Sequence, residues 1–277
     1  MKNDRTLDRQ LAKHPAVGSE PKRFYLWGRV HPHRARLRNL PMEVRVYLNA
    51  LRRRARPKGF ILYGRPRSGT TLLMDLLGQV PGVQSSGELY HSFLLFPRGF
   101  LAALLPAAKE PVFGFKLLSY QLCEVHKIRK PIAFFRRAEA KGFRLIYIRR
   151  GTFAQTLSLA KAQATGVYFV DGDVRQHVRI DPDYFVELLI WNDKMLSYEA
   201  EVVRALDHVE VDYERDLRDP AGHQALIDRL CADLGIASFP VAARLRRTGG
   251  EDGAIVLDNL PELRAATQAA GLAHLLP

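Results

Sequence analysis

Short apolar runs alternate with segments of helical periodicity along most of the chain. Residues 59–63 and 143–148 are mostly apolar over lengths typical of buried strands. Apolar residues at helical spacing follow each run, and residues 181–206 predict a long helix capped by Asp181 or Asp183. This alternation predicts an α/β fold with a parallel central sheet flanked by helices. Further expected elements are a helix over 151–166, a strand at 209–211 and a helix over 220–235.

Positive charge is concentrated in the first 58 residues. The chain has 42 Lys and Arg against 29 Asp and Glu, a net charge of +13. Residues 1–58 hold 16 of the basic and 4 of the acidic residues, a net of +12, which leaves 26 against 25 for residues 59–277. We therefore expect a basic N-terminal extension over 1–58, followed by one near-neutral domain over 59–277.

The basic extension divides into two parts. Residues 2–40 contain several prolines and show weak periodicity, so they are expected to be mostly extended. Residues 41–54 begin with proline and place Val44, Leu48 and Leu51 at helical spacing, so a helix is expected there. Its basic face is typical of a solvated helix, or of one that contacts an acidic membrane surface, a polyanionic substrate or nucleic acid. Nucleic acid is the least favoured partner, because the chain resembles no known nucleic-acid-binding motif.

Apolar runs and cysteines exclude several classes of protein. The longest apolar run, near 100–108, is interrupted by Pro106 and is too short to span a bilayer. The charged N-terminus lacks the apolar core of a secretory signal. Cys123 and Cys231 are far apart and indicate neither a disulfide framework nor a metal site. We expect a reduced, cytoplasmic protein that needs no metal; its oligomeric state is not indicated.

A glycine-containing loop, Gly64–Thr71, separates the first predicted strand from a helix whose apolar face begins at Leu72. Such a loop directs backbone N–H groups and the positive end of a helix at one point, which is suited to phosphate or sulfate. It nearly matches the pattern of nucleoside-triphosphate-binding loops, but Thr70 occupies the position of the lysine. Phosphoryl transfer is therefore less expected than anion binding, and Arg67 supplies a cation within the loop.

The segment Arg65-Pro-Arg-Ser-Gly-Thr-Thr-Leu72 resembles the 5′-phosphosulfate loop of sulfotransferases that use 3′-phosphoadenosine 5′-phosphosulfate (PAPS). Those enzymes share their fold with P-loop nucleotide kinases, so the resemblance implies a P-loop kinase-like sulfotransferase fold here. It also implies a set of residues that bind the sulfuryl donor. These are Arg65, Arg67, Ser68, Gly69, Thr70 and Thr71.

The same family requires a second anion site for the 3′-phosphate of the donor. Its pattern is a strand ending in arginine with a serine eight residues later, and Arg150 and Ser158 fit it. An arginine fork and a helix hydroxyl can converge on one phosphate. A late basic loop is also typical of the family, and Arg246 or Arg247 is expected to take this role unless the loop is simply a solvated charged segment. Residues 155–168 resemble, more narrowly, bacterial carbohydrate sulfotransferases.

Sulfuryl transfer to an alcohol needs a base for the hydroxyl proton. The resemblance to the bacterial branch favours Glu88, with His91 as the alternative because an imidazole titrates in the useful range. Lys116 lies in a segment that resembles the strand where cytosolic sulfotransferases carry a lysine and then a histidine base. Leu118 stands in place of that histidine, which argues against the cytosolic mechanism. Each of these residues also has a simpler interpretation without a catalytic role. Glu88 would then be a solvated side chain, His91 a structural histidine and Lys116 a lysine at a strand end.

Together these features predict a PAPS-dependent sulfotransferase that acts on a hydroxyl of a carbohydrate or glycolipid. Glu88, His91, Arg67 and Lys116 are its candidate catalytic residues. An ATP-dependent P-loop kinase of a small molecule is the first alternative. A non-enzymatic protein that binds polyanions or membranes is the second. The basic extension favours contact with an acidic membrane, at the inner surface where a lipid-linked acceptor would be found.

Overall fold

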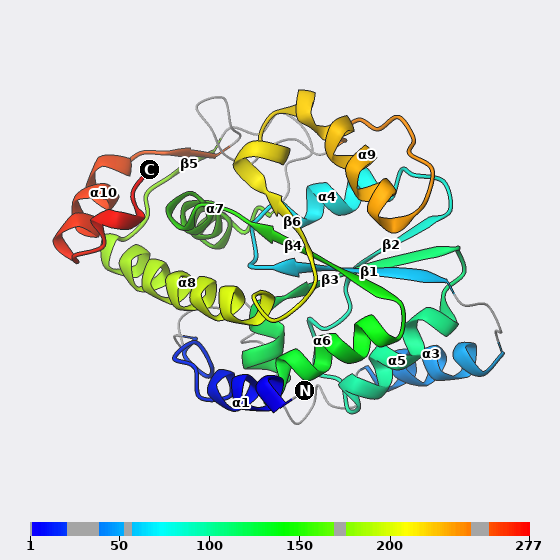
Figure 1. The fold of residues 1–277 in the computed structure, drawn as a ribbon. Coiled ribbons are helices and arrows are strands. Elements are labelled where there is room, and N and C mark those ends of the chain that lie inside the picture. Colours follow the sequence, from blue (N-terminus) through cyan, green and yellow to red (C-terminus); the bar gives the residue numbers. More distant parts are fainter. Residues whose placement is uncertain (1, 21–38, 53–56, 169–175, 245–254) are drawn as a thin grey trace.

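Five parallel strands form the central sheet, in the order β2-β3-β1-β4-β6 (Figure 1). The computed structural model describes residues 2–20, 39–52, 57–168, 176–244 and 255–277. The strands are β1 (Lys58–Gly64), β2 (Val83–Glu88), β3 (Val112–Leu118), β4 (Phe143–Arg149) and β6 (Val209–Asp212). Helices flank both faces, so the predicted α/β architecture with a parallel central sheet is confirmed.

The central strands are buried because the sheet is covered on both sides. All seven residues of β3 are buried, and so are all residues of β1 except Lys58. A strand covered on both faces needs a continuous apolar run rather than an alternating one, which is why the sequence marks these strands clearly. Gly114 lets β3 pass close to the ring of Phe60, since a Cβ at this glycine would lie 1.9 Å from that ring.

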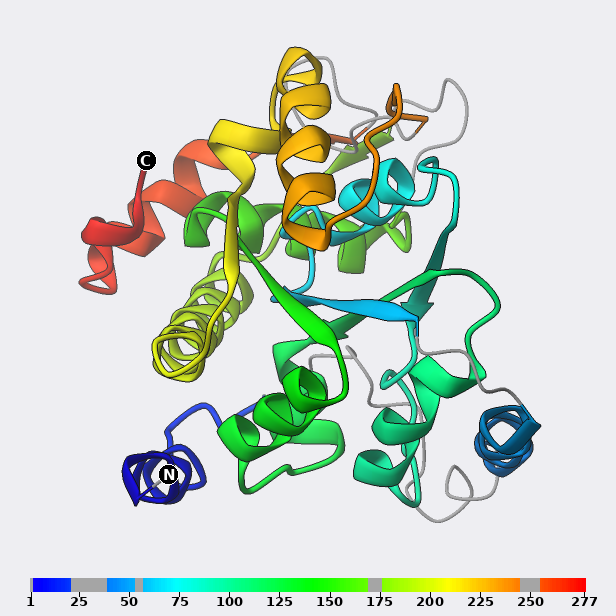
Figure 2. The ribbon, with the colours of Figure 1, turned by 45° about the vertical axis from the view of Figure 1, so that its right-hand side comes forward.

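Two apolar clusters lie on opposite faces of the sheet. Helices α4 (Thr70–Leu77) and α9 (His223–Leu234) contribute to one of them (Figure 2). The larger cluster, on the other face, involves α5 (Pro97–Ala107), α6 (Pro131–Ala140), α7 (Thr152–Thr165) and α8 (Pro182–Val203). Helix α10 (Leu260–Ala269) packs on α8. A second, two-stranded parallel sheet pairs β5 (Gln176–Val178) with β7 (Ile255–Leu257).

Most boundaries that the sequence predicts are confirmed. Asp181 caps α8 by accepting a hydrogen bond of 2.7 Å from the Tyr184 amide. Gly166 and Gly235 end α7 and α9 in the left-handed conformation that glycine favours. Short turns complete the described chain. They are π-helical at Gln121–Val125 and Tyr213–Leu217, and 3-10-helical at Pro220–Gly222 and Ala273–Leu275.

The N-terminal segment is more ordered than the sequence predicts. Residues Lys2–Leu11 form helix α1, so the expectation of an extended chain is wrong there. The Asp8 carboxylate accepts hydrogen bonds from the amides of Ile132 (2.9 Å) and Ala133 (3.3 Å), and so caps α6 from a distance in sequence. The helix expected over 41–54 is present as α3 (Leu40–Arg52). The division into domains at residue 58 stays a prediction.

Chain connections diverge to opposite faces of the sheet at the carboxyl ends of the central strands. The helix that follows β1 covers one face of the sheet, whereas the helices that follow its neighbours β3 and β4 contribute to the other (Figure 1). Loops therefore diverge from this point, and ligands of open parallel sheets bind at such points. In the part of the chain that the structure describes, no helix has the length and apolar character needed to cross a membrane.

Candidate functional site

The loop between β1 and α4 has the backbone of an anion cradle. Arg67 and Gly69 have positive φ angles of 66° and 94°, which turn the chain sharply into α4. A Cβ at Gly69 would lie 2.6 Å from the ring of Tyr213, so only glycine fits this position without movement. Gly69 is the N-cap residue and has no side chain to offer the first amides of α4. Those amides therefore keep their capacity to bind an anion.

Ser68 adds an unsatisfied hydroxyl to this loop. Its side chain is fully buried, and its Oγ has no hydrogen-bond partner among the described residues. A buried hydroxyl without a partner is unfavourable by itself and marks a place where a ligand or water supplies the missing bond. Thr70, two residues further on, is also buried.

Arg67, Arg150 and Ser158 lie together beside the loop, although the sequence separates them widely. Arg67 Nε donates to Ser158 Oγ at 3.1 Å, and Arg150 Nη1 donates to the Arg67 carbonyl at 2.9 Å. The Arg150 guanidinium lies over the ring of Tyr213, 4.1 Å from its centroid. Burial and the nearby charge of Arg150 lower the pKa of Arg67. Two like charges held this close are stabilised by an anion that binds between or beside them.

The carboxylate of Glu214 lies beside Arg150 and the start of α7. The Glu214 carboxylate lies 3.4 Å from the Gly151 amide, which donates to it at the start of α7. The same carboxylate is 3.9 Å from Arg150 Nε. Glu214 thus neutralises the two groups that would otherwise attract a phosphate. Glu214 lies in the π-helical turn Tyr213–Leu217.

Arg65 points into the protein. Its guanidinium is fully buried, and it donates to the Arg150 carbonyl at 2.9 Å and to Thr152 Oγ1 at 3.3 Å. The Glu199 carboxylate lies 3.4 Å from Arg65 Nε, and this side chain is equally buried. Burial raises the pKa of Glu199 to about 7, and the charge of Arg65 opposes that shift. All these contacts are internal, so a ligand-facing role for Arg65 stays a prediction.

The candidate base lies at the carboxyl end of β2, next to Lys116 on β3. Register pairs Glu88 with Lys116, and the Lys116 Nζ atom is 3.3 Å from Glu88 Oε1. Lys116 also donates to Thr71 Oγ1 at 3.2 Å, which links the carboxylate to the first turn of α4. On the other side, Gln121 Nε2 donates to Glu88 Oε2 at 2.9 Å. Lys116 of β3 and Gln121 of the turn that follows β3 therefore hold this carboxylate on its two oxygens.

His91 joins the same cluster. Its Nδ1 atom is 3.5 Å from Glu88 Oε2 and 3.0 Å from the Tyr120 hydroxyl. Burial raises the pKa of Glu88, but the hydrogen bond from His91 and the charge of Lys116 outweigh it and give a net lowering. Glu88 is therefore ionised at neutral pH, as a proton acceptor must be. Tyr120 and Gln121 carried no signal in the sequence, because their role depends on the π-helical turn that follows β3.

Two of the predicted residues, Arg246 and Arg247, lie outside the described residues. The structure brings the others into two neighbouring groups at the carboxyl edge of the sheet, with Arg65 behind them. Within the described ranges, no group of three or more His, Cys, Asp or Glu side chains is arranged to hold a metal ion.

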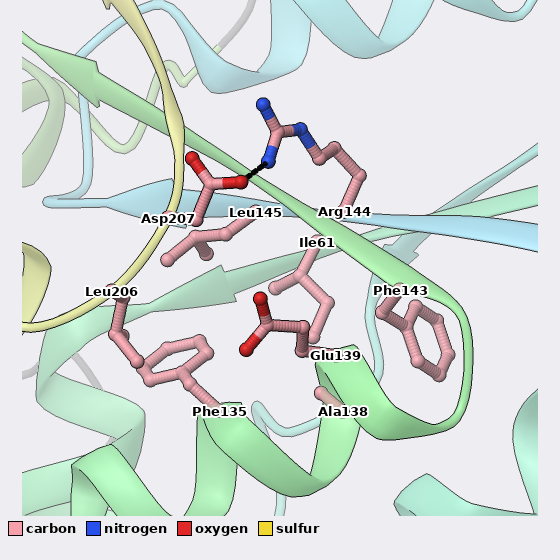
Figure 3. Close-up of a pocket in the computed structure, with 9 residues that line it drawn as sticks. All are labelled: Ile61, Phe135, Ala138, Glu139, Phe143, Arg144, Leu145, Leu206 and Asp207. Carbon is pink, nitrogen blue, oxygen red and sulfur yellow. Dashed lines mark hydrogen bonds and ion pairs between the residues drawn. The ribbon is translucent and has the colours of Figure 1, made fainter. Parts of the chain in front are cut away.

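A hollow elsewhere on the molecule is unrelated to this edge. It lies between β1, β4 and α6, and Arg144 pairs with Asp207 at its rim (Figure 3). None of the predicted site residues lines it. The lining residues are Ile61, Phe135, Ala138, Glu139, Phe143, Arg144, Leu145, Leu206 and Asp207.

Comparison with known proteins gives no further assignment. No protein-family model matches this chain, and a search of curated proteins returns no significant match. The residues themselves offer amides, two arginines and hydroxyls to an anion, and a neighbouring ionised carboxylate to a proton.

Proposed function

We propose that this chain is a sulfotransferase that moves a sulfuryl group from PAPS to a hydroxyl of a carbohydrate or glycolipid. One observation carries the proposal: a loop with uncapped amides and a pair of arginines share one edge of the sheet with a partly buried, ionised carboxylate. Glu88 is connected to the loop helix through Lys116 and Thr71, with contacts of 3.3 Å and 3.2 Å. This arrangement can bind an anionic donor and deprotonate an alcohol beside it.

The residues present suit a donor with two phosphate positions. The loop amides, Ser68 and Thr71 would hold the 5′-phosphosulfate, because Gly69 leaves the amides at the start of α4 uncapped. Arg150 and Ser158 would hold the 3′-phosphate, and Arg67, hydrogen-bonded to Ser158, would lie between the two groups. The unpartnered Ser68 hydroxyl and the close pair of arginines are the features that such an anion would satisfy.

In the proposed reaction, Glu88 takes the proton of the acceptor hydroxyl. The acceptor oxygen forms a bond to sulfur while the bond between sulfur and the phosphate oxygen breaks, which leaves 3′,5′-adenosine bisphosphate. Arg67 and Lys116 would offset the negative charge that develops on the leaving phosphate. His91 would either position Glu88 or replace it as the base. The scheme requires no metal ion.

Ligand-induced stabilisation tests the donor site directly. A ligand present at a hundredfold excess over its Kd stabilises the native state by about 2.7 kcal/mol. In a protein of this size the melting temperature then rises by roughly 5–10 °C. We expect 3′,5′-adenosine bisphosphate to give such a rise, and Arg150→Ala to remove it. The Arg149→Ala variant is the matched control, because Arg149 pairs instead with Glu210 (2.7 Å) and Asp212 (3.0 Å) at the surface.

The outcome separates the proposal from its alternatives. No stabilisation of the parent protein by 3′,5′-adenosine bisphosphate would refute the donor assignment. Stabilisation by ATP with Mg²⁺ instead would indicate a P-loop kinase. Indifference to every nucleotide would favour the non-enzymatic alternative. Transfer itself is then tested with PAPS and candidate glycan acceptors, where Glu88→Gln should abolish product formation without abolishing the thermal shift. A cytoplasmic location, near the inner membrane surface, is part of the proposal.

A further inference from the structure

Helix α3 has apolar residues on two of its faces. On the inner face, Met42 and Val46 pack against the large apolar cluster, and the Glu43 side chain is buried. On the outer face a second line of apolar residues meets solvent. It consists of Leu40, Val44, Leu48 and Leu51, exposed by 38%, 45%, 46% and 83%. Their spacing of four, four and three residues places them in one stripe along the helix.

This stripe is the main accumulation of exposed large apolar side chains in the described ranges. Eight such side chains occur there, and four of them form the stripe. A fifth, Phe96, is 65% exposed and adjoins α3, since its amide donates to Glu43 Oε2 and its carbonyl accepts from the Tyr47 hydroxyl. Single exposed apolar residues need no explanation, but a contiguous group of them marks an interaction surface. Helix α3 lies at the outside of the molecule, next to α5 (Figures 1 and 2).

The charges beside the stripe select the partner. Arg45 and Arg52 are exposed and lie seven residues apart, so both follow the same side of the stripe. Glu43 is the only acidic residue of α3, and its buried carboxylate is engaged with the amides of Leu95 and Phe96. The whole segment of residues 1–58 has a net charge of +12. A second copy of this chain would bring like charges together, whereas an anionic surface would complement them.

We propose that the outer face of α3 docks this protein onto a lipid bilayer with anionic headgroups. Leu40, Val44, Leu48 and Leu51 enter the boundary between headgroups and acyl chains, and Arg45 and Arg52 contact lipid phosphates. The helix is thus an interfacial anchor that lies in the plane of the membrane. Its inner face stays packed on the protein, so docking requires no unfolding.

Docking through α3 would also orient the candidate active site. The Asn39 side chain donates to the Phe93 carbonyl at 3.1 Å, and Glu43 accepts from the Leu95 amide at 2.9 Å. Phe93 and Leu95 belong to the segment that leads from Glu88 through His91 to α5. A protein docked on this face therefore holds the part of that segment at Phe93 and Leu95 near the lipid surface. Resting on the proposed function, this favours a lipid-linked glycan over a free sugar as the acceptor.

Co-sedimentation of the full chain with vesicles tests the docking surface. We expect binding to vesicles of equal parts phosphatidylglycerol and phosphatidylcholine, weaker binding at high salt, and little binding to phosphatidylcholine alone. Replacing Val44 and Leu48 together by Glu should lower the partition coefficient by about tenfold or more. In the matched control, Ile190 and Phe239 are both replaced by Glu; their side chains are 38% and 46% exposed elsewhere on the molecule. That control should bind as the parent does.

Three results would overturn the proposal. The first is a parent chain that does not bind anionic vesicles. The second is a Val44→Glu/Leu48→Glu variant that binds as tightly as the parent while melting at the same temperature. The third is a parent dimer in solution that this variant dissociates, which would assign the stripe to a second copy. The docking proposal and the donor assignment fail separately, because Arg150→Ala should still bind vesicles and the α3 variant should still respond to 3′,5′-adenosine bisphosphate.

Discussion

The buried pair of Arg65 and Glu199 supports the floor of the candidate site, and its charge state can be tested with one isosteric substitution. Both side chains are fully buried, with Arg65 Nε 3.4 Å from Glu199 Oε2. Burial raises the pKa of Glu199 to about 7 and outweighs the stabilising charge of Arg65. Glu199→Gln keeps the shape of the side chain and removes its titration. The difference in stability between the two proteins should therefore change with pH.

The sign and size of that change follow from proton linkage. In the unfolded chain the Glu199 carboxyl loses its proton near its ordinary pKa of 4.5, whereas the folded protein keeps the proton until about pH 7. The folded state thus binds more protons across this window, so the free energy of unfolding falls as pH rises through it. A pKa difference of about 2.5 corresponds to about 3 kcal/mol. As the pH rises from 5 to 8, the free energy of unfolding of the Gln variant should therefore increase relative to that of the parent by about this amount.

Urea unfolding of both proteins at pH 5 and pH 8 measures the effect, since other titrating groups largely cancel in the difference. Glu210→Gln is a suitable control, because this exposed residue pairs with Arg149 at the surface and should alter stability by less than about 1 kcal/mol. The opposite trend, in which the Glu199 variant loses stability relative to the parent as pH rises, would show that Arg65 outweighs burial. The charged pair would then stabilise the fold.

Three further predictions concern single residues. Gly69→Ala should destabilise the protein by roughly 1–3 kcal/mol and weaken its response to 3′,5′-adenosine bisphosphate. The new Cβ would lie 2.6 Å from the Tyr213 ring, and alanine would be strained at a φ of 94°. An unchanged urea midpoint would contradict this. Glu214→Gln should bind 3′,5′-adenosine bisphosphate several-fold more tightly in calorimetry, since it removes a negative charge 3.9 Å from Arg150, and weaker binding would mean that Glu214 helps to build the site. Asp8→Ala should cost about 1 kcal/mol in urea unfolding because α6 loses its cap, and no loss would show that water replaces the carboxylate.

The elements that the sequence predicts well are those whose signal is local. Strand β1 is a continuous apolar run because both of its faces are buried, and α8 begins at Asp181 because that side chain caps it. The signal of the loop Gly64–Thr71 is equally local, since its glycines and hydroxyl residues are adjacent in sequence. Arg150 and Ser158 could be singled out because the family resemblance fixes their spacing on one strand and helix.

The features that the sequence did not reveal depend on contacts between distant segments. Helix α1 is held in place because its Asp8 caps α6, more than a hundred residues away in the sequence. The direction of Arg65 is set by Glu199, which has no distinguishing pattern inside α8. Gln121 reaches Glu88 only because a π-helical turn follows β3. In each case a polar group is placed by tertiary packing, and periodicity carries no information about it.

The loop between β1 and α4 and the segment between β4 and α7 hold one another through backbone carbonyls. Arg150 donates to the carbonyl of Arg67, and Arg65 donates to the carbonyl of Arg150, at 2.9 Å in both cases. These reciprocal bonds fix the separation between the loop and the second site before any ligand arrives. Under the proposed function, a ligand with two anionic groups at this separation would bind both segments without an ordering cost, whereas a ligand with a single phosphate would contact only one of them. Selectivity would come from molecular length as much as from charge.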